Sequence, residues 1–207
     1  MKFVVASASP RRHELLRGLG LAFEVTPADI DEAAAAGARP PDEAVLTVAL
    51  AKAAIVSRAD ALVLAADTIV VLDGEVLGKP ASPADARRML EGLRGRSHRV
   101  LTAVCVASAG RERTAVVESE VRLRRYAPAE IDAYVAAGGG LDKAGAYGIQ
   151  DEPFQPVDAI AGCWCNVMGL PLWTTWDLLV AANLPVPRTP ARAFARCAEC
   201  PLGREVA

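Results

Sequence analysis

Apolar and polar residues follow two different periods along the chain, and this pattern predicts strands and helices in turn. Short apolar runs predict strands at residues 2–7, 23–25, 61–72, 98–108 and 113–126. Apolar residues at spacings of three and four predict helices at residues 11–19, 41–59, 84–93, 129–137 and 172–183. Turn signals at 73–74 and 110 predict hairpins in the middle of the chain. The order of these elements predicts an α/β protein with a mixed sheet.

Composition narrows the class of protein. Of the 207 residues, 52% are apolar and 23% charged, which excludes wholesale disorder, and the formal net charge of −2 argues against a nucleic-acid-binding surface. Apolar runs are too short for a membrane span, and the N-terminus does not have the pattern of a secretory signal. We therefore expect a cytoplasmic enzyme or binding protein with no membrane or nucleic-acid partner. Residues 1–185 are expected to form the folded domain, and residues 186–207, rich in Pro, Arg and Ala, an appended tail.

Four of the five cysteines come in two close pairs. Cys197 and Cys200 have metal-site spacing, and Cys163 with Cys165 could supply two more thiolates to a structural zinc ion. Against zinc, the first pair lies in the tail, and the sequence has only two histidines as further ligands. We expect ordinary reduced thiols.

An acidic residue interrupts the most apolar predicted strand. Asp67 lies in the middle of "LVLAADTIVVL", where an unpaired carboxylate would be costly to bury. Either a structural partner neutralises Asp67, or the strand carries a reactive group at this point. In the second case the carboxylate should line a pocket rather than lie sealed in the core.

Four basic residues stand at positions that call for an explanation. Arg11 and Arg12 occupy the first turn of a helix opened by Ser9, where the helix dipole disfavours cations unless an anion such as phosphate binds between them. Lys52 shares a helix face with apolar residues, and Lys79 is held between a glycine and a proline. The alternatives are that Arg11 and Arg12 are simply solvated, that the Lys52 side chain snorkels to the surface, and that Lys79 lies in an ordinary turn.

Acidic residues follow the second predicted strand. Asp29, Asp31 and Glu32 read as a solvent-facing loop, but together with Asp67 they could hold Mg²⁺, which prefers oxygen ligands. The sequence has no "GxxxxGK[ST]", "GxSxG" or "HExxH" motif, and only two histidines, so a histidine-based triad or metal cluster is not expected.

Seven ordered blocks resemble one family. The segments "SASPRRHELL", "DE" at 31–32, "ALAKA", "AADTIVVLDGEVLGKP", "RSHRVLTAV", "DKAGAYGIQ" and "NVMGLPL" are similar in type and order to those of the Maf-like nucleotide pyrophosphatases, over about residues 3 to 185. The resemblance implies an elongated, two-lobed α/β fold of the Maf/ITPase type around a mixed, twisted sheet with a central cleft, commonly dimeric. It implies hydrolysis of nucleoside triphosphates between the α and β phosphates with a divalent metal, Mg²⁺, Mn²⁺ or Co²⁺.

The resemblance also assigns roles by motif position. Asp67 falls where the family has its general base, with Lys52, Lys79 and Arg12 as further catalytic positions and Glu32 with Asp67 as metal ligands. The implied substrate-binding positions are Ser7, Ser9, Arg11, Thr68 and Gln150, and "AGAYGIQ" resembles the branch acting on dTTP and UTP rather than on 7-methyl-GTP.

Two features depart from the family pattern. Asp151 stands where the family usually has glycine, which puts the nucleobase preference in doubt, and Cys163-Trp164-Cys165 replaces small polar residues. The alternative function is a nucleotide-binding regulator of cell division with little catalysis.

Overall fold

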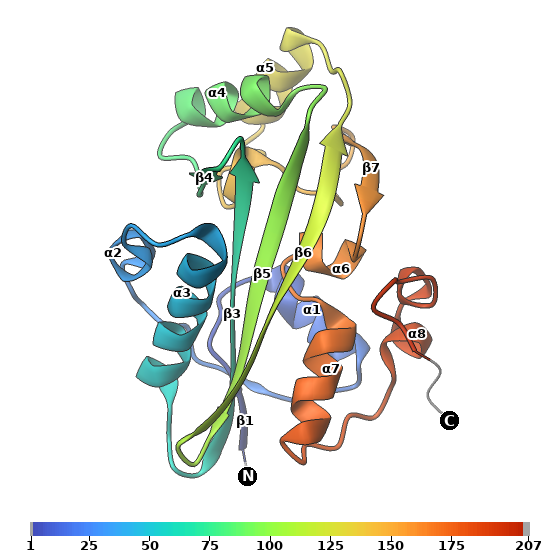
Figure 1. Cartoon of the computed structure of the whole chain (residues 1–207). Helices are drawn as coiled ribbons and strands as arrows, with labels where there is room; N and C mark the ends of the chain where they lie inside the picture. The colour runs from blue at the N-terminus through green and yellow to red at the C-terminus, as the bar shows by residue number, and fades with distance from the viewer. Residues whose placement is uncertain (1, 205–207) are drawn as a thin grey trace.

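The computed structural model describes residues 2–204, which form one mixed sheet with helices on both faces (Figure 1). The strand order is β2–β1–β3–β5–β6–β7, and β4 pairs with β3 outside this path. Strand β1 is parallel to β2 and β3, whereas all the other pairs are antiparallel. The strands are β1 (Lys2–Val5), β2 (Glu24–Val25), β3 (Ala61–Leu72), β4 (Glu75–Leu77), β5 (Ser97–Ser108), β6 (Arg111–Leu123) and β7 (Val157–Ala161).

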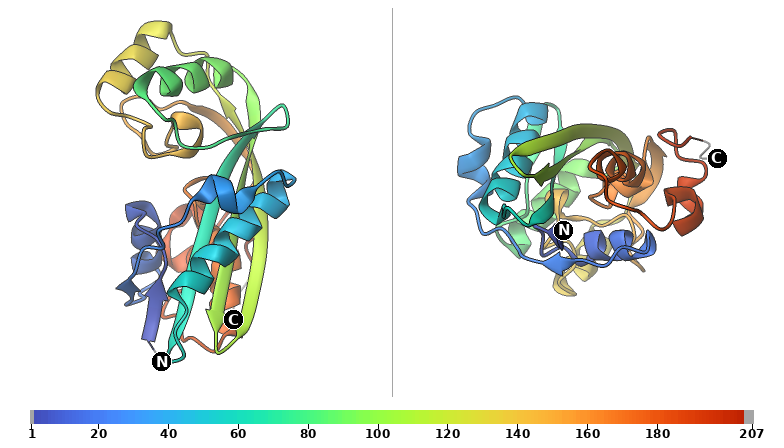
Figure 2. Two further views of the ribbon diagram at one scale, coloured as in Figure 1. Left: turned by 90° about the vertical axis from the view of Figure 1, so that its left-hand side faces the viewer. Right: turned by 90° about the horizontal axis from the view of Figure 1, so that it is seen from below.

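Three long strands connect two lobes. Strands β3, β5 and β6 run the length of the molecule, so its shape is elongated (Figures 1 and 2). The helices are α1 (Pro10–Gly18), α2 (Glu32–Ala36), α3 (Pro41–Val56), α4 (Pro83–Leu93), α5 (Pro128–Ala136), α6 (Trp164–Val167), α7 (Leu172–Ala181) and α8 (Pro190–Ala193), with 3₁₀ turns η1 (Ala144–Ala146) and η2 (Ala195–Cys197). The predicted two-lobed α/β fold around a mixed sheet is confirmed. None of the helices in residues 2–204 combines the length and hydropathy needed to cross a bilayer.

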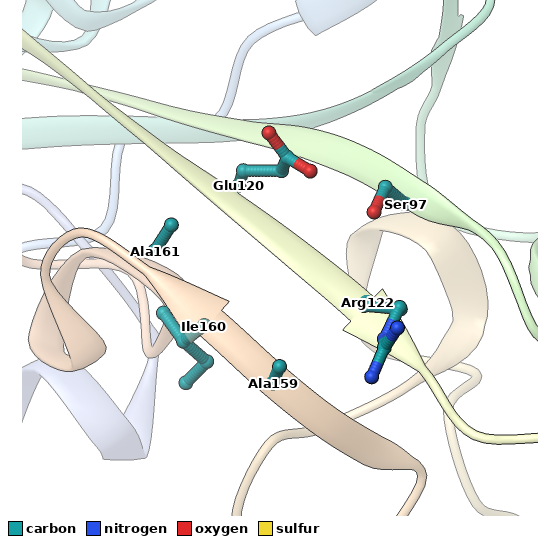
Figure 3. A pocket seen from close by; sticks show the side chains of 6 residues that line it. All are labelled: Ser97, Glu120, Arg122, Ala159, Ile160 and Ala161. Carbon is teal, nitrogen blue, oxygen red and sulfur yellow. The ribbon is translucent and has the colours of Figure 1, made fainter.

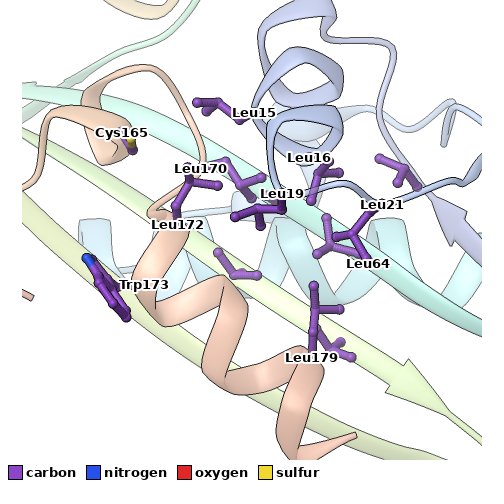
Figure 4. Close-up of a cluster of buried hydrophobic side chains, with 14 of the residues drawn as sticks. Leu15, Leu16, Leu19, Leu21, Leu64, Cys165, Leu170, Leu172, Trp173 and Leu179 are labelled. Atoms are coloured by element: carbon purple, nitrogen blue, oxygen red, sulfur yellow. The ribbon is translucent and has the colours of Figure 1, made fainter. Parts of the chain in front are cut away.

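The lower lobe has a separate apolar core on each face of the sheet. Along β3, Leu62 and Leu64 pack with residues of α1 and α7, while Val63 and Ala65 pack with residues of α3. Figure 4 shows the first of these cores. Because side chains alternate between the faces of a strand, residue 67 is directed to the α3 side and residue 68 to the α1 side. A third core, which includes Leu90, fills the upper lobe under α4 and α5.

Strand β3 has an uncovered stretch on one side. Strand β5 pairs with it from Val63 to Val71, but on the opposite side β1 covers only residues 61–64 and β4 only residues 70–72. The helices α1 and α3, which connect β1 to β2 and β2 to β3, lie on opposite faces of the sheet (Figure 2). In open α/β sheets this arrangement leaves a crevice beyond the carboxyl ends of the parallel strands, where ligands bind.

Some expectations about local structure were wrong. The acidic segment is partly helical, since α2 begins at Glu32 and Asp31 caps it by accepting a hydrogen bond from the Ala34 amide at 2.9 Å. Strand β7 was not predicted. The C-terminal segment, expected as an appended tail, packs on the domain: its Phe194 ring lies so close to Gly18 that a Cβ there would be 2.3 Å away, and the Arg188 amide donates to the Leu19 carbonyl at 3.1 Å. The division at residue 185 stays a prediction.

Candidate active site

A buried lysine joins two acidic residues at the uncovered stretch of β3. Lys52 Nζ on α3 lies 2.7 Å from Asp67 Oδ1 and 2.8 Å from Glu32 Oε1. Lys52 and Asp67 are 7% and 6% exposed, whereas the Glu32 side chain is 42% exposed. Lys79 Nζ, from the turn after β4, lies 3.7 Å from Glu32. The charge of Asp67 is therefore balanced by Lys52, and the carboxylate is more closed off than the expected pocket-lining position.

The electrostatics favour the ionised form of Glu32. Burial alone would raise the pKa of this carboxyl, but the hydrogen bond and charge of Lys52, with the charges of Lys79 and Arg12, lower it overall.

Arg12 is buried on the other face of the sheet and binds only neutral groups. Its Nε donates to the Gly169 carbonyl at 2.8 Å, and Nη1 donates to the Ala66 carbonyl at 2.8 Å and to Ser7 Oγ at 3.2 Å. Its Nη2 donates to Thr68 Oγ1 at 3.0 Å. The Ala66 carbonyl belongs to the stretch that β1 leaves unpaired, so the guanidinium takes the place of a strand partner.

No carboxylate among residues 2–204 comes within ion-pair distance of Arg12. Burial lowers the pKa of this guanidinium, opposed by the charge of Asp67, while Arg11 lowers it further and Glu32 raises it. A buried cation that lacks a contacting anion favours the binding of one.

Gly169 permits the approach of Arg12. Its φ is +104°, and a Cβ would lie 3.4 Å from Thr68 Oγ1 and 3.5 Å from Arg12 Nε. The left-handed backbone and the close neighbours both favour glycine.

Of the remaining predicted residues, Ser7 is buried beside Arg12, whereas Ser9, Arg11 and Gln150 are more exposed. Ser7 Oγ also accepts the Ser9 amide at 3.2 Å, although Ser9, the N-cap of α1, forms no side-chain capping bond. Arg11 Nη1 lies 3.1 Å from Asp142 Oδ2, which connects α1 to the loop after α5. Gln150 is exposed, and its Nε2 donates to Asp151 Oδ1 at 3.3 Å.

Asp151 itself is held by other residues. Its carboxylate accepts a short hydrogen bond from the Tyr134 hydroxyl and lies 3.4 Å from Lys143 Nζ. Burial, and next the hydrogen bond to Asp151, raise the pKa of Tyr134. The negative charge of Asp151, beside Gln150, is thus bound by Tyr134 and Lys143.

The residues at Lys52 fit a divalent metal. Glu32 and Asp67 each direct an oxygen at one cationic group, and two carboxylates shared with phosphate oxygens are a usual donor set for Mg²⁺. Within residues 2–204, no group of three or more His, Cys, Asp or Glu side chains already has the arrangement of a metal site.

A hollow elsewhere on the surface does not contain these residues. It has a volume of about 260 Å³ and is lined by Ser97, Glu120, Arg122, Ala159, Ile160 and Ala161 (Figure 3). Because this hollow is open and contains none of the predicted site residues, it is not part of the candidate active site.

Three residues that support the site were not singled out from the sequence. Thr102 of β5 bonds Thr68 Oγ1 at 2.9 Å, Gly169 receives Arg12, and Asp142 receives Arg11. Gly169 and Asp142 lie inside the blocks "NVMGLPL" and "DKAGAYGIQ", which could have pointed to them.

Comparison with known proteins identifies the family of this chain. The family model "Maf-like protein" matches residues 2–182. The chain belongs to the Maf-like protein family. A Maf-like relative from Anaeromyxobacter dehalogenans, named dTTP/UTP pyrophosphatase, is 55% identical over 190 residues, covering 90% of this chain and 96% of its own. Another of that name, from Thermomicrobium roseum, is 45% identical over 205 residues, covering 98% and 94%.

Among solved structures, a nucleoside-triphosphatase, dITP/XTP pyrophosphatase, from Mycobacterium abscessus aligns with 89% of this Maf-like chain and 100% of its own, with a TM-score of 0.43 and 17% identity. A likeness this low supports no argument about the site.

Proposed function

We propose that this Maf-like protein is a nucleoside triphosphate pyrophosphatase that hydrolyses dTTP and UTP to the monophosphate and pyrophosphate. The observation that carries the proposal is the buried Asp67–Lys52 pair with the more exposed Glu32 at the uncovered stretch of β3, and Arg12, a cation without a contacting carboxylate, on the other face of the sheet. The names of the relatives support the choice of reaction and substrate.

The side chains divide the work between binding and proton transfer. Arg11, Arg12 and Lys79 would bind the triphosphate, since guanidinium and ammonium groups oppose phosphate charge and catalysis of such transfers depends chiefly on positioning and electrostatics. Ser7 and Ser9 would line the phosphate side of the pocket, and Arg11, Thr68 and Gln150 would read the base.

Asp67 would act as the general base. Lys52 holds Oδ1, so Oδ2 is the oxygen that would take the proton from a water molecule. The water oxygen forms a bond to the α-phosphorus, the bond from that phosphorus to the bridging oxygen breaks, and pyrophosphate leaves with the electron pair.

In the alternative role of Asp67, this carboxylate and Glu32 would hold a divalent metal, Mg²⁺, Mn²⁺ or Co²⁺. When bound, the ion would neutralise phosphate charge. Lys52 would then position the carboxylates of Glu32 and Asp67 beside the metal and the phosphate. We also propose a cytoplasmic homodimer, on the family resemblance.

The test is a nucleotide panel with Mg²⁺ or Mn²⁺. Pyrophosphate and monophosphate should appear together from dTTP and UTP, and not from 7-methyl-GTP. Release of orthophosphate with a nucleoside diphosphate would contradict the proposed bond cleavage. Tight nucleotide binding without turnover would support the regulator instead.

A further inference from the structure

Four cysteine thiols that this chemistry does not use meet at one place. Cys165 Sγ lies 3.3 Å from Cys197 Sγ, and Cys163 and Cys200 stand two and three residues from these cysteines in the sequence. Cys163, Cys165 and Cys197 are 2%, 1% and 1% exposed, and Cys200 is half-buried. We propose that these four cysteines form a tetrathiolate site for a structural zinc ion.

The two pairs come from segments far apart in the sequence. Residues 163–165 open α6, and residues 197–200 follow α8, where the C-terminal segment comes to lie beside α6 and α7 (Figure 1). The Arg196 guanidinium stacks over the Trp164 ring at 5.2 Å, and Trp173 Nε1 donates to the Cys197 carbonyl at 2.9 Å. The backbone around the thiols is thus fixed by contacts that do not involve sulfur.

The separation of the sulfurs suits zinc better than a disulfide. A disulfide bond requires about 2.05 Å between sulfurs, whereas tetrahedral zinc with bonds of about 2.3 Å places its sulfur ligands about 3.8 Å apart. The 3.3 Å between Cys165 and Cys197 lies near the second value, and all the cysteines are free thiols.

The thiols are not yet arranged around one centre. Among residues 2–204 no group of three or more His, Cys, Asp or Glu side chains has metal-site geometry. Metal binding therefore requires the cysteine side chains to change rotamer about χ1.

The backbone of the first pair is held in place. The Asn166 amide donates to the Cys163 carbonyl at 3.1 Å, and Ser119 Oγ accepts the Cys163 amide at 2.9 Å. Cysteine binds metal as the thiolate.

Zinc at this site would attach the C-terminal segment to α6 and restrain the loop whose Gly169 carbonyl binds Arg12. The Cys165 carbonyl accepts the Leu170 amide at 2.9 Å, and the neighbouring Gly169 carbonyl receives Arg12 Nε. The same C-terminal segment packs on α1 through Phe194.

The experiment is a metal analysis of the full chain, expressed with zinc, purified with a reductant and dialysed against metal-free buffer. Mass spectrometry should find one zinc per chain. Exchange to Co²⁺ should give intense thiolate-to-cobalt charge-transfer bands, which an oxygen-ligated ion at Glu32 and Asp67 cannot give. The absence of zinc and of the cobalt bands would therefore contradict the cysteine site alone, whereas the absence of pyrophosphate release would contradict the proposed function.

Variants test the ligands. Cys197→Ser/Cys200→Ser should lose the zinc and the cobalt bands and lower the Tm, and Cys200→Ser alone, at the half-buried position, should weaken zinc retention in a chain that still folds. Cys105→Ala, which removes the cysteine buried in β5, should keep one zinc. The proposal is overturned if the reduced wild-type chain takes up no zinc, if the double variant retains it, or if Cys165 and Cys197 form a disulfide in reductant.

Discussion

His98 makes the stability of the fold depend on pH in a window where few other groups titrate. The ring is 3% exposed in the upper lobe, its Nε2 lies 2.7 Å from the Tyr147 hydroxyl, and its Nδ1 has no hydrogen-bond partner within residues 2–204. Burial lowers the pKa of His98 from 6.5 to about 4, because a charged ring would lose its hydration.

The direction in which stability changes with pH follows from which state of the chain binds the proton. Between pH 6.5 and 4 the unfolded chain binds a proton at His98 and the folded chain does not, so the stability is complete above about pH 6.5 and is lost as the pH falls toward 4. The loss from this ring is about 2 kcal/mol by pH 5 and about 3 kcal/mol at the lower end. Glu32, whose pKa is lowered, adds its own loss only as the pH falls below its ordinary value of 4.5.

The assay is urea unfolding of the wild type and His98→Gln from pH 7 to pH 5. The variant should lack the decline of about 2 kcal/mol. Tyr147→Phe is the matched control: it removes the hydrogen-bond partner but leaves the ring buried, so it should keep the decline. Equal pH dependence in the wild type and His98→Gln would refute the reasoning.

Two further predictions concern the site and the loop beside it. Lys52→Met leaves the Asp67 carboxylate buried without its partner, so urea unfolding should show a loss of about 3–5 kcal/mol, most of it recovered in Lys52→Met/Asp67→Asn; no recovery would show that the pair does not act as a unit. Gly138 and Gly140 both have positive φ, but a Cβ at Gly140 would lie 2.0 Å from the Ala146 carbonyl oxygen, whereas Gly138 has open space. Gly138→Ala should therefore cost about 1–2 kcal/mol and Gly140→Ala clearly more, and equal costs would contradict the described loop.

The regular elements could be predicted because each follows from local pattern. Strand β3 and helix α3 have the periodicities of their structures, and alternation along β3 assigns Asp67 and Thr68 to opposite faces once the helices are placed. The sequence also marks Lys52 as unusual on an apolar helix face, and in the structure it forms an ion pair with Asp67.

The parts that could not be predicted depend on contacts distant in sequence. Phosphate binding by Arg12 stays a prediction, but its hydrogen bonds to backbone and hydroxyl groups of β3 and to Gly169 could not be foreseen, because only the folded chain brings these groups together. The convergence of Cys163 and Cys165 with the C-terminal cysteines likewise depends on a docking surface that no local pattern encodes.

The most direct test of the site is Asp67→Asn, because it removes the proposed base and keeps the shape of the side chain. Pyrophosphate release from dTTP should fall by at least about 100-fold, while calorimetric dTTP binding stays within a few-fold of the wild type. Pyrophosphate release close to the wild-type rate would contradict the assignment of Asp67.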